Sequence, residues 1–448
     1  MTSLVVHPAE GPLVGSVPVP ADKSIAHRAL LFGGIANGIT HVKGYAAGAD
    51  NDATLAAMQQ LGAEIERVGE RELRIKGTGL FGLRAPAAPI DCGNSGTTMR
   101  LLSGLLAAQP FASTLVGDAS LSRRPMMRIA APLRLRGARI EGAAHPKKPQ
   151  EITAPLHIGP LGEDTYLTAL EFESPIASAQ VKSAILLSGL FAHGVTHFRE
   201  PSVSRDHTER LLSALGAPIR AMGSFVELDP AGWNGQLPGF ELDVPGDLSA
   251  AAFLVTAGAT VAGSRVVVRH VGLNPTRTGL LEVLRDMGAR VEAEPLGEVS
   301  GEPIGNLVSA FGDLVGVTVG GERVLRSIDE VPILCVLAAR ASGTTTIRDA
   351  QELRTKESDR LAMMAKVLRA FGVTCEELDD GLVVQGRPGK LTAAHVESDG
   401  DHRIAMSAAI LGLHADGPSR IDDADCIATS FPRFVGTLRA LGARIDVA

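Results

Sequence analysis

The hydrophobic and polar positions of the chain follow a pattern that recurs six times. In each copy a helical pattern ends in a large apolar residue, a glycine follows, and a short β-branched stretch comes next. One copy would only mark the end of a helix in an αβ protein, but six copies at near-regular spacing predict six units of similar size. The glycines lie 70 to 84 residues apart, at Gly62, Gly137, Gly216, Gly288, Gly372 and Gly442.

A second helix precedes each of these helices. It is rich in Ala, Leu and Ser and runs into Gly or Thr and an apolar strand, as in residues 183–198 and 404–421. Every unit is therefore predicted to hold two helices and several strands. Residues 19–24 (VPADKS) also resemble residues 244–249 (VPGDLS), which lie 225 positions later, or three units along the chain. Because the units are long for an open solenoid and the halves are paired, we predict two globular domains.

Charge and cysteine content argue against several classes of protein. The 43 Lys and Arg against 50 Asp and Glu leave a net charge of −7, which argues against nucleic acid or an anionic membrane as a partner. The start of the chain does not read as a secretory signal, and no apolar run is long enough for a membrane span. No CxxC or Cys/His metal spacing occurs, so we expect reduced thiols in a cytoplasmic protein, with no disulfide and no metal site. The cysteines are Cys92, Cys335, Cys375 and Cys426.

Basic residues gather just before or within the first turns of the predicted helices. A helix start carries unpaired N–H groups and a partial positive charge, so each exposed cation there costs about 0.3–1 kcal/mol unless an anion compensates. If these helix starts converge, they would form a site for two phosphates and a carboxylate. The residues concerned are Lys23, Arg28, Arg100, Arg123, Arg124, Lys182, Arg205, Lys356, Arg360 and Arg403.

Some of the cations are expected to be solvated surface charges instead. We place Arg123, Arg277 and Lys182 in this group. Gly96 fits the close approach of a ligand to the backbone beside a helix start, although a simple tight turn explains the glycine equally well.

The acid and base candidates are less distinctive. Asp329 directly precedes an apolar helix, and Glu357 lies between Lys356 and Arg360. On an exposed helix this second group would be an ordinary network of neighbouring charges. Asp401 could likewise be a helix cap.

Seven short segments resemble the 5-enolpyruvylshikimate-3-phosphate synthase family in order and approximate spacing. Each segment alone is weak evidence of a relationship, but the ordered set is specific to this family and covers essentially the whole chain. The segments are 22–28 (DKSIAHR), 94–97 (NSGT), 124–126 (RPM), 178–180 (SAQ), 205–209 (RDHTE), 354–360 (RTKESDR) and 401–406 (DHRIAM).

The resemblance implies an α/β (α+β) fold of two similar domains, each of three βαβαββ units with helices packed inside and sheets outside, an inside-out α/β barrel. The first domain would be discontinuous, with residues 1–20 and 246–448, and the second would hold residues 21–245. The active site would lie in the cleft between them, which closes on substrate.

The resemblance also implies a cofactor-free, metal-free transferase, expected to be a monomer. It would transfer the enolpyruvyl group of phosphoenolpyruvate to the 5-hydroxyl of shikimate-3-phosphate and release phosphate, in the pathway to chorismate and aromatic amino acids. Shikimate-3-phosphate would be bound by Lys23, Ser24, Arg28, Ser178, Gln180, Arg205, Asp329 and Lys356. Phosphoenolpyruvate would be bound by Lys23, Gly96, Arg124, Gln180, Arg360 and Arg403.

The acid and base roles also follow from the resemblance. Asp329 is the hypothesised base near the 5-hydroxyl. Glu357, assisted by Lys23, is the hypothesised proton donor and acceptor at C3 of phosphoenolpyruvate.

Some details are similar to the second class of this family, which includes enzymes tolerant of glyphosate. They are the pair Ser178-Ala179, Thr429 before Ser430-Phe431-Pro432, and the segments 205–207 and 117–121. Gly96 nevertheless predicts more sensitivity to glyphosate than an alanine would give. Glyphosate occupies the phosphoenolpyruvate site in this family, and a methyl group at this position crowds it.

Two alternatives stay open. UDP-N-acetylglucosamine enolpyruvyl transferase shares the architecture and chemistry, but it begins with a Lys-Asn pair where this chain has Lys23-Ser24. It also usually carries a reactive cysteine before an Arg-Pro, where this chain has Ser122-Arg123-Arg124-Pro125. A non-catalytic anion-binding module or repeat scaffold would bind ligand without releasing phosphate. The joint presence of carboxylates and cations speaks against it.

Overall fold

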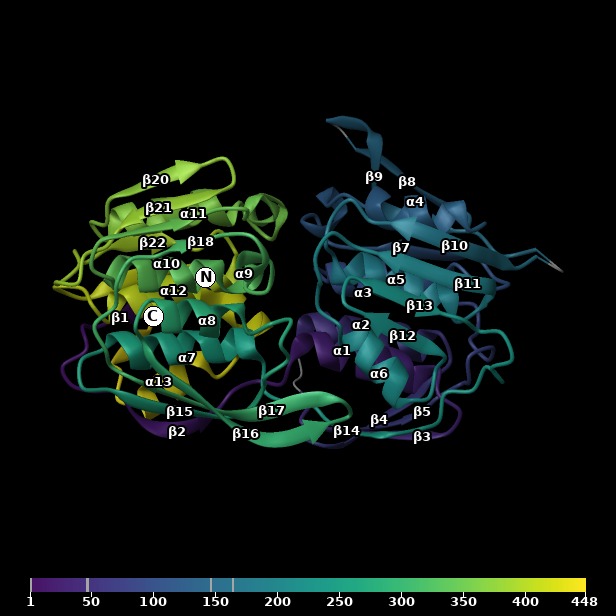
Figure 1. Cartoon of the computed structure of the whole chain (residues 1–448), viewed down its shortest axis with the longest axis horizontal. Helices are drawn as coiled ribbons and strands as arrows, with labels where there is room; N and C mark the ends of the chain where they lie inside the picture. Colours follow the sequence, from purple (N-terminus) through teal and green to yellow (C-terminus); the bar gives the residue numbers. More distant parts are fainter. Residues whose placement is uncertain (1, 46–47, 146, 163–164) are drawn as a thin grey trace. The chain divides into compact units, whose positions relative to one another are not determined.

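The computed structural model describes residues 2–45, 48–145, 147–162 and 165–448. The chain divides into two compact units, each with three of the six four-stranded sheets (Figure 1). Unit 1 holds Met1–Pro20, Pro245–Glu298 and Pro303–Ala448, and unit 2 holds Ala21–Val244 and Val299–Glu302.

The described part of unit 2 has two helices for each of its three sheets. Its helices are α1 (Lys23–Gly34), α2 (Ala49–Gln60), α3 (Gly96–Leu106), α4 (Met127–Leu135), α5 (Ala179–Gly189) and α6 (His207–Ala214), with the 3-10 turn η1 (Leu121–Arg123). Its strands are β3 (Ile39–Lys43), β4 (Glu64–Gly69), β5 (Glu72–Lys76), β6 (Ile90–Asp91), β7 (Ser113–Val116), β8 (Ile140–His145), β9 (Lys148–Ile158), β10 (Leu167–Glu173), β11 (Ala192–Arg199), β12 (Ile219–Met222), β13 (Phe225–Leu228) and β14 (Glu241–Asp243).

Unit 1 repeats this plan with additional short turns. Its helices are α7 (Leu248–Thr260), α8 (Gly279–Asp286), α9 (Glu322–Leu325), α10 (Val331–Arg340), α11 (Arg360–Ala370), α12 (His402–Gly412) and α13 (Phe434–Ala440), with the 3-10 turns η2 (Ile328–Glu330), η3 (Gln351–Thr355) and η4 (Ala424–Thr429). Its strands are β1 (Leu4–Val6), β2 (Val14–Pro18), β15 (Arg265–Gly272), β16 (Arg290–Val299), β17 (Glu302–Ala310), β18 (Thr318–Val319), β19 (Thr344–Ile347), β20 (Cys375–Leu378), β21 (Gly381–Gln385), β22 (His395–Glu397), β23 (Ser419–Asp422) and β24 (Ile445–Val447).

All six sheets share one strand order. In the sheet β18-β19-β21-β20, β19 runs parallel to β18 and antiparallel to β21, and β21 runs antiparallel to β20. The helix α10 leads into β19 and α11 leads into β20. The other sheets repeat this order, which confirms the predicted βαβαββ unit.

Three sheets take one strand from a distant part of the chain. Strand β1 pairs with both β23 and β24, so the start of the chain completes the sheet built by its end. Strand β2 is parallel to β15, and β14 is parallel to β3. Each unit is therefore closed by pairings between residues far apart in the sequence.

The six repeat glycines end the second helix of each βαβαββ unit. All six have a positive φ, between 74° and 111°. In each copy the residue after the glycine donates its N–H to the carbonyl five residues earlier, as Ala63 does to Met58 at 3.0 Å. This is the helix ending in which glycine adopts the left-handed conformation. The helix ends predicted from the sequence are confirmed.

The first helix of each βαβαββ unit lies in the core. In unit 1, α7, α10 and α12 pack on one another and almost all of their residues are buried (Figure 1). In unit 2, α3 and α5 approach so closely that a Cβ on Gly104 would lie 2.2 Å from the carbonyl oxygen of Ala184. Strands such as β3 alternate exposed and buried positions. Helices inside and sheets outside confirm the predicted fold class.

Among the residues that the structure describes, none of the helices combines the length and apolar character needed to cross a membrane.

Candidate active site

In unit 2, three core helices begin where the predicted ligand-binding residues lie. Helix α1 starts at Lys23, α3 at Gly96, and α5 directly after Ser178. The side chains of Asp22, Ser95 and Ser178 cap these helices by accepting a backbone N–H of the first turn. None of these three helices, all described in full, has an acidic residue in its first turn. The other N–H groups and the helix dipole therefore favour an anion.

Five residues gather at the start of α3. Arg100 Nη1 donates to Oε1 of Gln180 at 2.7 Å, and Gln180 Nε2 donates to Oγ1 of Thr97 at 3.0 Å. A Cβ on Gly96 would lie 2.8 Å from Arg100 Nη1 and 3.3 Å from Arg124 Nη1. The structure thus brings Gly96, Arg124 and Gln180, all predicted to bind phosphoenolpyruvate, around one helix start.

An ion pair and hydrogen bonds hold Lys23 and Arg124 near the same helix start. Lys23 pairs with the carboxylate of Asp50, whose backbone carbonyl accepts a hydrogen bond from Thr98 Oγ1 at 3.3 Å. Arg124 Nη2 donates to Oδ1 of Asn94 at 2.7 Å. Both cations are therefore held by groups at, or linked to, the beginning of α3.

Arg28 is buried within α1 and touches two other helices. Its Nε donates to Thr208 Oγ1 at 2.7 Å, its Nη2 donates to Ser183 Oγ at 2.7 Å, and its Nη1 donates to the Ser24 carbonyl at 2.9 Å. Burial lowers the pKa of Arg28 to about 10, and the charge of Arg205 contributes to this lowering. The guanidinium is therefore charged at neutral pH. Arg205 itself is half-buried in the turn before α6.

Lys182 is not the surface charge that the sequence suggested. Its side chain is 1% exposed, with Nζ 2.7 Å from Glu200 Oε1 and 2.8 Å from Glu209 Oε1. The prediction was wrong because the two carboxylates come from the turn that follows β11 and from α6. The residues beside Lys182 in the sequence therefore do not reveal this pairing.

Arg277 is also buried, against expectation. Its Nη2 donates to Asp247 Oδ1 at 3.0 Å and to Ser249 Oγ at 2.7 Å, both at the start of α7. Ser249 in turn donates to the carboxylate of Glu330. These partners are distant in sequence, which explains the error. Arg123 is exposed, as predicted.

In unit 1, three cations surround one carboxylate. Asp329 Oδ1 lies 3.5 Å from Arg360 Nη1 and 3.9 Å from Lys356 Nζ, and Oδ2 lies 3.9 Å from Arg403 Nη2. Arg403 Nη1 also donates to the Asp329 carbonyl at 2.8 Å. Lys356 has a closer partner in Glu352, at 2.9 Å. Four of the predicted site residues therefore come together here. They belong to η2, to the segment after η3, and to the starts of α11 and α12.

Arg360 is buried among carboxylates. Its Nη2 donates to Glu357 Oε2 at 2.6 Å and its Nε to Asp401 Oδ2 at 2.8 Å. Burial opposes the charged form, but Glu357, Asp401 and Asp329 raise the pKa of Arg360 above its ordinary value. Burial alone would raise the pKa of Asp401, yet Arg360 and His402 lower it below its usual range. Arg360 and Asp401 therefore form a charged pair.

Sequence reasoning left several members of these clusters without a role. Arg100 was recognised only as a cation at a helix start, and Asp401 only as a helix cap. Asp50, the partner of Lys23, lies in a first turn of α2 where acidic residues are ordinary. Asn94 and Thr97, which help to hold Arg124 and Gln180, appeared in the sequence analysis only within the segment 94–97 and had no role of their own.

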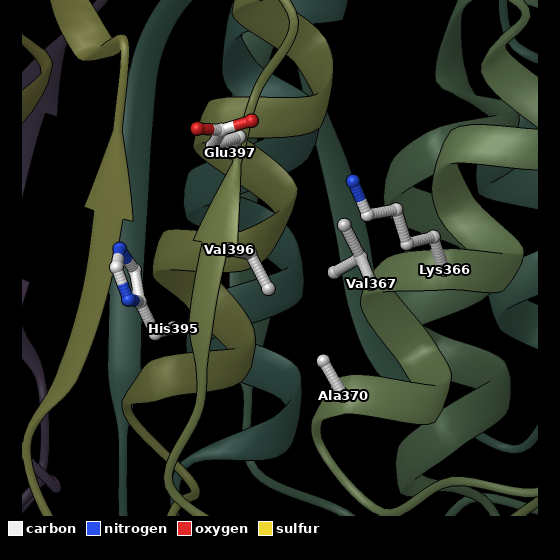
Figure 2. Close-up of a pocket in the computed structure, with 6 residues that line it drawn as sticks. All are labelled: Lys366, Val367, Ala370, His395, Val396 and Glu397. Atoms are coloured by element: carbon white, nitrogen blue, oxygen red, sulfur yellow. The ribbon is translucent and has the colours of Figure 1, made fainter.

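A surface hollow elsewhere in unit 1 contains none of the predicted site residues. It lies between α11 and β22, has a volume of about 260 Å³, and is shown in Figure 2. It is lined by Lys366, Val367, Ala370, His395, Val396 and Glu397. This hollow is therefore not the site that the sequence predicts.

Comparison with known proteins identifies the family. The family model described as EPSP synthase (3-phosphoshikimate 1-carboxyvinyltransferase) matches residues 8–438. A 3-phosphoshikimate 1-carboxyvinyltransferase of Geobacter sulfurreducens is 48% identical over 448 residues, covering 99% of this chain and 100% of the relative. One of Acidithiobacillus ferrooxidans is 48% identical over 449 residues, covering 100% of both chains.

Solved structures agree. A structure of EPSP synthase from Acinetobacter baumannii aligns with a TM-score of 0.88 and 42% identity, covering 100% of both chains. A second structure of EPSP synthase from this organism aligns with a TM-score of 0.87. Full-length matches in sequence and in fold, together with the helix-start clusters of both units, show that the chain belongs to the EPSP synthase family.

Proposed function

We propose that the residues gathered at the helix starts of both units act on one pair of substrates. The chain is a transferase that moves the enolpyruvyl group of phosphoenolpyruvate to the 5-hydroxyl of shikimate-3-phosphate and releases phosphate, a step toward chorismate and the aromatic amino acids. One observation carries the assignment of residues. Three cations converge on one carboxylate, since Lys356, Arg360 and Arg403 all lie close to Asp329.

Shikimate-3-phosphate carries a phosphate, a carboxylate and hydroxyl groups, and the proposed binding set offers partners for each. Arg28 is already oriented by two hydroxyl groups and its backbone neighbour Ser24. A fixed guanidinium suits an oxyanion because less side-chain freedom is lost on binding. The proposed set is Lys23, Ser24, Arg28, Ser178, Gln180, Arg205, Asp329 and Lys356.

Phosphoenolpyruvate would bind at the start of α3 and contact the arginines of unit 1. The absence of a Cβ at Gly96 leaves the backbone N–H groups accessible beside Arg124. Arg360 and Arg403 would neutralise the carboxylate and phosphate charges and position the substrate. The proposed set is Lys23, Gly96, Arg124, Gln180, Arg360 and Arg403.

The chemistry needs one base and one proton donor. The 5-hydroxyl oxygen adds to C2 of phosphoenolpyruvate while C3 takes a proton. Phosphate then leaves C2 with its bonding electrons, and C3 loses a proton to restore the double bond. We assign Asp329 as the base at the hydroxyl, and Glu357, with Lys23, as the group that gives and takes the C3 proton.

The experiment is phosphate release by Asp329→Asn and Glu357→Gln. Each change keeps the size of the side chain and removes its proton-accepting charge, so we expect kcat to fall by about 10²–10⁴-fold with folding intact. Glu282→Gln is the control, because Glu282 pairs with Arg326 near the surface of unit 1, away from the assigned residues, and should keep full turnover. Near-normal turnover in either test variant would contradict the assigned role.

The acceptor is tested with the same assay. Phosphate release with shikimate-3-phosphate but not with UDP-N-acetylglucosamine is the expected result. Tight binding of both substrates without release would instead indicate an anion-binding module. We also propose that glyphosate competes with phosphoenolpyruvate, that the enzyme is a monomer, and that it is cytoplasmic, in keeping with its free cysteines.

A further inference from the structure

Lys182 lies one turn into α5, out of contact with solvent, at the centre of a buried ionic cluster in unit 2. Its ammonium contacts the carboxylates of Glu200 and Glu209 at 2.7 and 2.8 Å. It also donates to the Ser204 carbonyl at 3.2 Å. Burial lowers the pKa of Lys182, but the charges of Glu209 and Glu200 together raise it above its ordinary value. The lysine is therefore charged at neutral pH.

The two carboxylates depend on this ammonium. The second oxygens, Glu200 Oε2 and Glu209 Oε2, are buried and have no hydrogen-bond partner among the described residues. A buried ion pair adds little net stability, because desolvation offsets most of the attraction. Breaking it by removing one partner is costly, because a buried charge is left uncompensated. The cluster therefore specifies positions more than it adds stability.

The cluster fixes the backbone of the segment that contains Arg205. Glu200 follows β11, and its Oε1 accepts the backbone N–H of Ser204 at 2.9 Å, which closes the turn between them. Lys182 holds the carbonyl of the same Ser204. Glu209 lies in the first turn of α6. The backbone on both sides of Arg205 is thus fixed by one ammonium group.

The same cluster also borders Arg28. Arg28 donates to Ser183, the residue after Lys182, and to Thr208, the residue before Glu209. Ser183 and Thr208 are themselves hydrogen-bonded to one another, with 2.7 Å between their hydroxyl oxygens. A change in the distance between α5 and α6 would therefore move both groups that orient the Arg28 guanidinium.

We propose that Lys182 is a positioning residue for shikimate-3-phosphate, holding Arg28 and Arg205 in place through Glu200 and Glu209. The proposal rests on the proposed function, in which Arg28 and Arg205 bind that substrate. Lys182 itself does not touch the ligand. Its effect should appear in the affinity for shikimate-3-phosphate rather than in the affinity for phosphoenolpyruvate, because the residues that its ammonium contacts, Glu200, Ser204 and Glu209, flank Arg205 in the sequence rather than Gly96 or Arg124.

The test is the steady-state kinetics of Lys182→Met, which keeps the length of the side chain and removes its charge. We expect KM for shikimate-3-phosphate to rise by about 10-fold or more, while KM for phosphoenolpyruvate and kcat at saturation change by less than about 3-fold. Lys182→Arg should recover part of the lost affinity because it restores the charge. An unchanged KM for shikimate-3-phosphate in folded Lys182→Met would overturn the proposal, and so would equal increases in both KM values.

Arg136→Met is the matched control for a merely structural effect. Arg136 is also a buried cation of unit 2, but it donates to Ile185, Ser188, Thr168 and Thr196 near the other end of α5. Its removal should lower stability and leave the KM for shikimate-3-phosphate unchanged. A comparable rise in that KM would mean that any buried charge lost beside α5 has the same effect, which contradicts a specific role for Lys182.

Three further variants complete the design. If Lys182→Met does not fold, Glu209→Gln decides, because it keeps shape and hydrogen bonding while removing one charge, and the same rise in KM for shikimate-3-phosphate is expected. Arg28→Gln and Arg205→Gln test the proposed function directly. If these two leave the KM for shikimate-3-phosphate unchanged, the proposed binding set is wrong. If they raise it while Lys182→Met does not, only the positioning role is wrong.

Discussion

The Arg360 guanidinium donates to Asp401, with Nε 2.8 Å from Oδ2 and both side chains buried. The other carboxylate oxygen accepts the backbone N–H of Arg403 at 2.9 Å and caps α12. One carboxylate therefore holds the side chain of Arg360 and the backbone of Arg403, two arginines that we assign to phosphoenolpyruvate. The cap and the ion pair meet at a single residue, so a helix start and a binding site are fixed together.

Replacing Asp401 should impair phosphoenolpyruvate binding. Asp401→Asn can keep the cap but removes the charge that holds Arg360, and we expect KM for phosphoenolpyruvate to rise by about 10-fold or more. Asp401→Ala also leaves Arg360 with one buried partner fewer and should lower the free energy of unfolding by about 3–5 kcal/mol. Steady-state kinetics and urea unfolding measure the two effects. Asp380→Asn, at an ion pair with Arg348 on the surface of unit 1, should change neither.

A methyl group at Gly96 should reduce glyphosate binding. The added Cβ would lie 2.8 Å from Arg100 Nη1 and 3.3 Å from Arg124 Nη1. Both atoms are the ends of flexible side chains, so Gly96→Ala should fold, but it narrows the space beside the helix start. We expect the inhibition constant of glyphosate to rise by about 10-fold or more, with a smaller rise in KM for phosphoenolpyruvate.

Inhibition assays at several phosphoenolpyruvate concentrations check this expectation. Gly389→Ala is the control, because a Cβ there meets nothing within 4 Å. An inhibition constant that does not change in Gly96→Ala would contradict the steric explanation.

The parts of the fold that depend on neighbouring residues could be predicted from the sequence. The six glycines end helices because only their backbone enters the left-handed region at low cost, and this preference acts within a few residues. The pairing of β1 with β24 and of β14 with β3 depends on residues at opposite ends of a unit. A helix or strand pattern contains no information about such a partner.

The candidate site likewise has a part that could be predicted from the sequence and a part that could not. Helix starts and their cations could be located from the sequence, since capping residues and basic side chains lie within one turn. The burial of Lys182 and Arg277 could not be predicted from the sequence, because it depends on carboxylates that other elements contribute, such as those of Glu200 and Glu330. An isolated lysine in a helix is usually exposed, so the single-sequence expectation followed the commoner case.

The buried histidine of α1 should make stability depend on pH. Burial lowers the pKa of His27 from 6.5 to about 3; Asp50 opposes this shift, and Lys23 and Arg28 add to it. The unfolded imidazole takes up a proton below about pH 6.5, whereas the folded one stays neutral until the pH approaches its folded value. The stability contributed by neutral His27 is present above pH 6.5 and is lost as the pH falls toward the folded pKa, by about 1.4 kcal/mol per pH unit.

Urea unfolding of the wild type and of His27→Gln at pH 7.5, 5.5 and 4.5 measures this loss. Glutamine does not titrate, so the difference in unfolding free energy between the two proteins should shrink as the pH falls, while any other buried histidines affect both proteins alike. A difference that stays constant from pH 7.5 to 4.5 would show that His27 does not supply the pH dependence.

The crossing of α3 and α5 should not tolerate a larger residue at Gly104. A Cβ there would lie 2.2 Å from the carbonyl oxygen of Ala184 and 2.7 Å from its Cα, and backbone atoms cannot move aside as a side chain can. Gly104→Ala should therefore lower the free energy of unfolding by about 1–3 kcal/mol or more, although alanine is the better helix former. Gly436→Ala is the matched control in α13, where a Cβ meets nothing within 4 Å, and it should raise stability by up to about 1 kcal/mol. Urea unfolding of the two variants compares the same chemical change at a packed and an open helix position. Equal effects on stability would mean that the close approach of α3 and α5 imposes no steric limit.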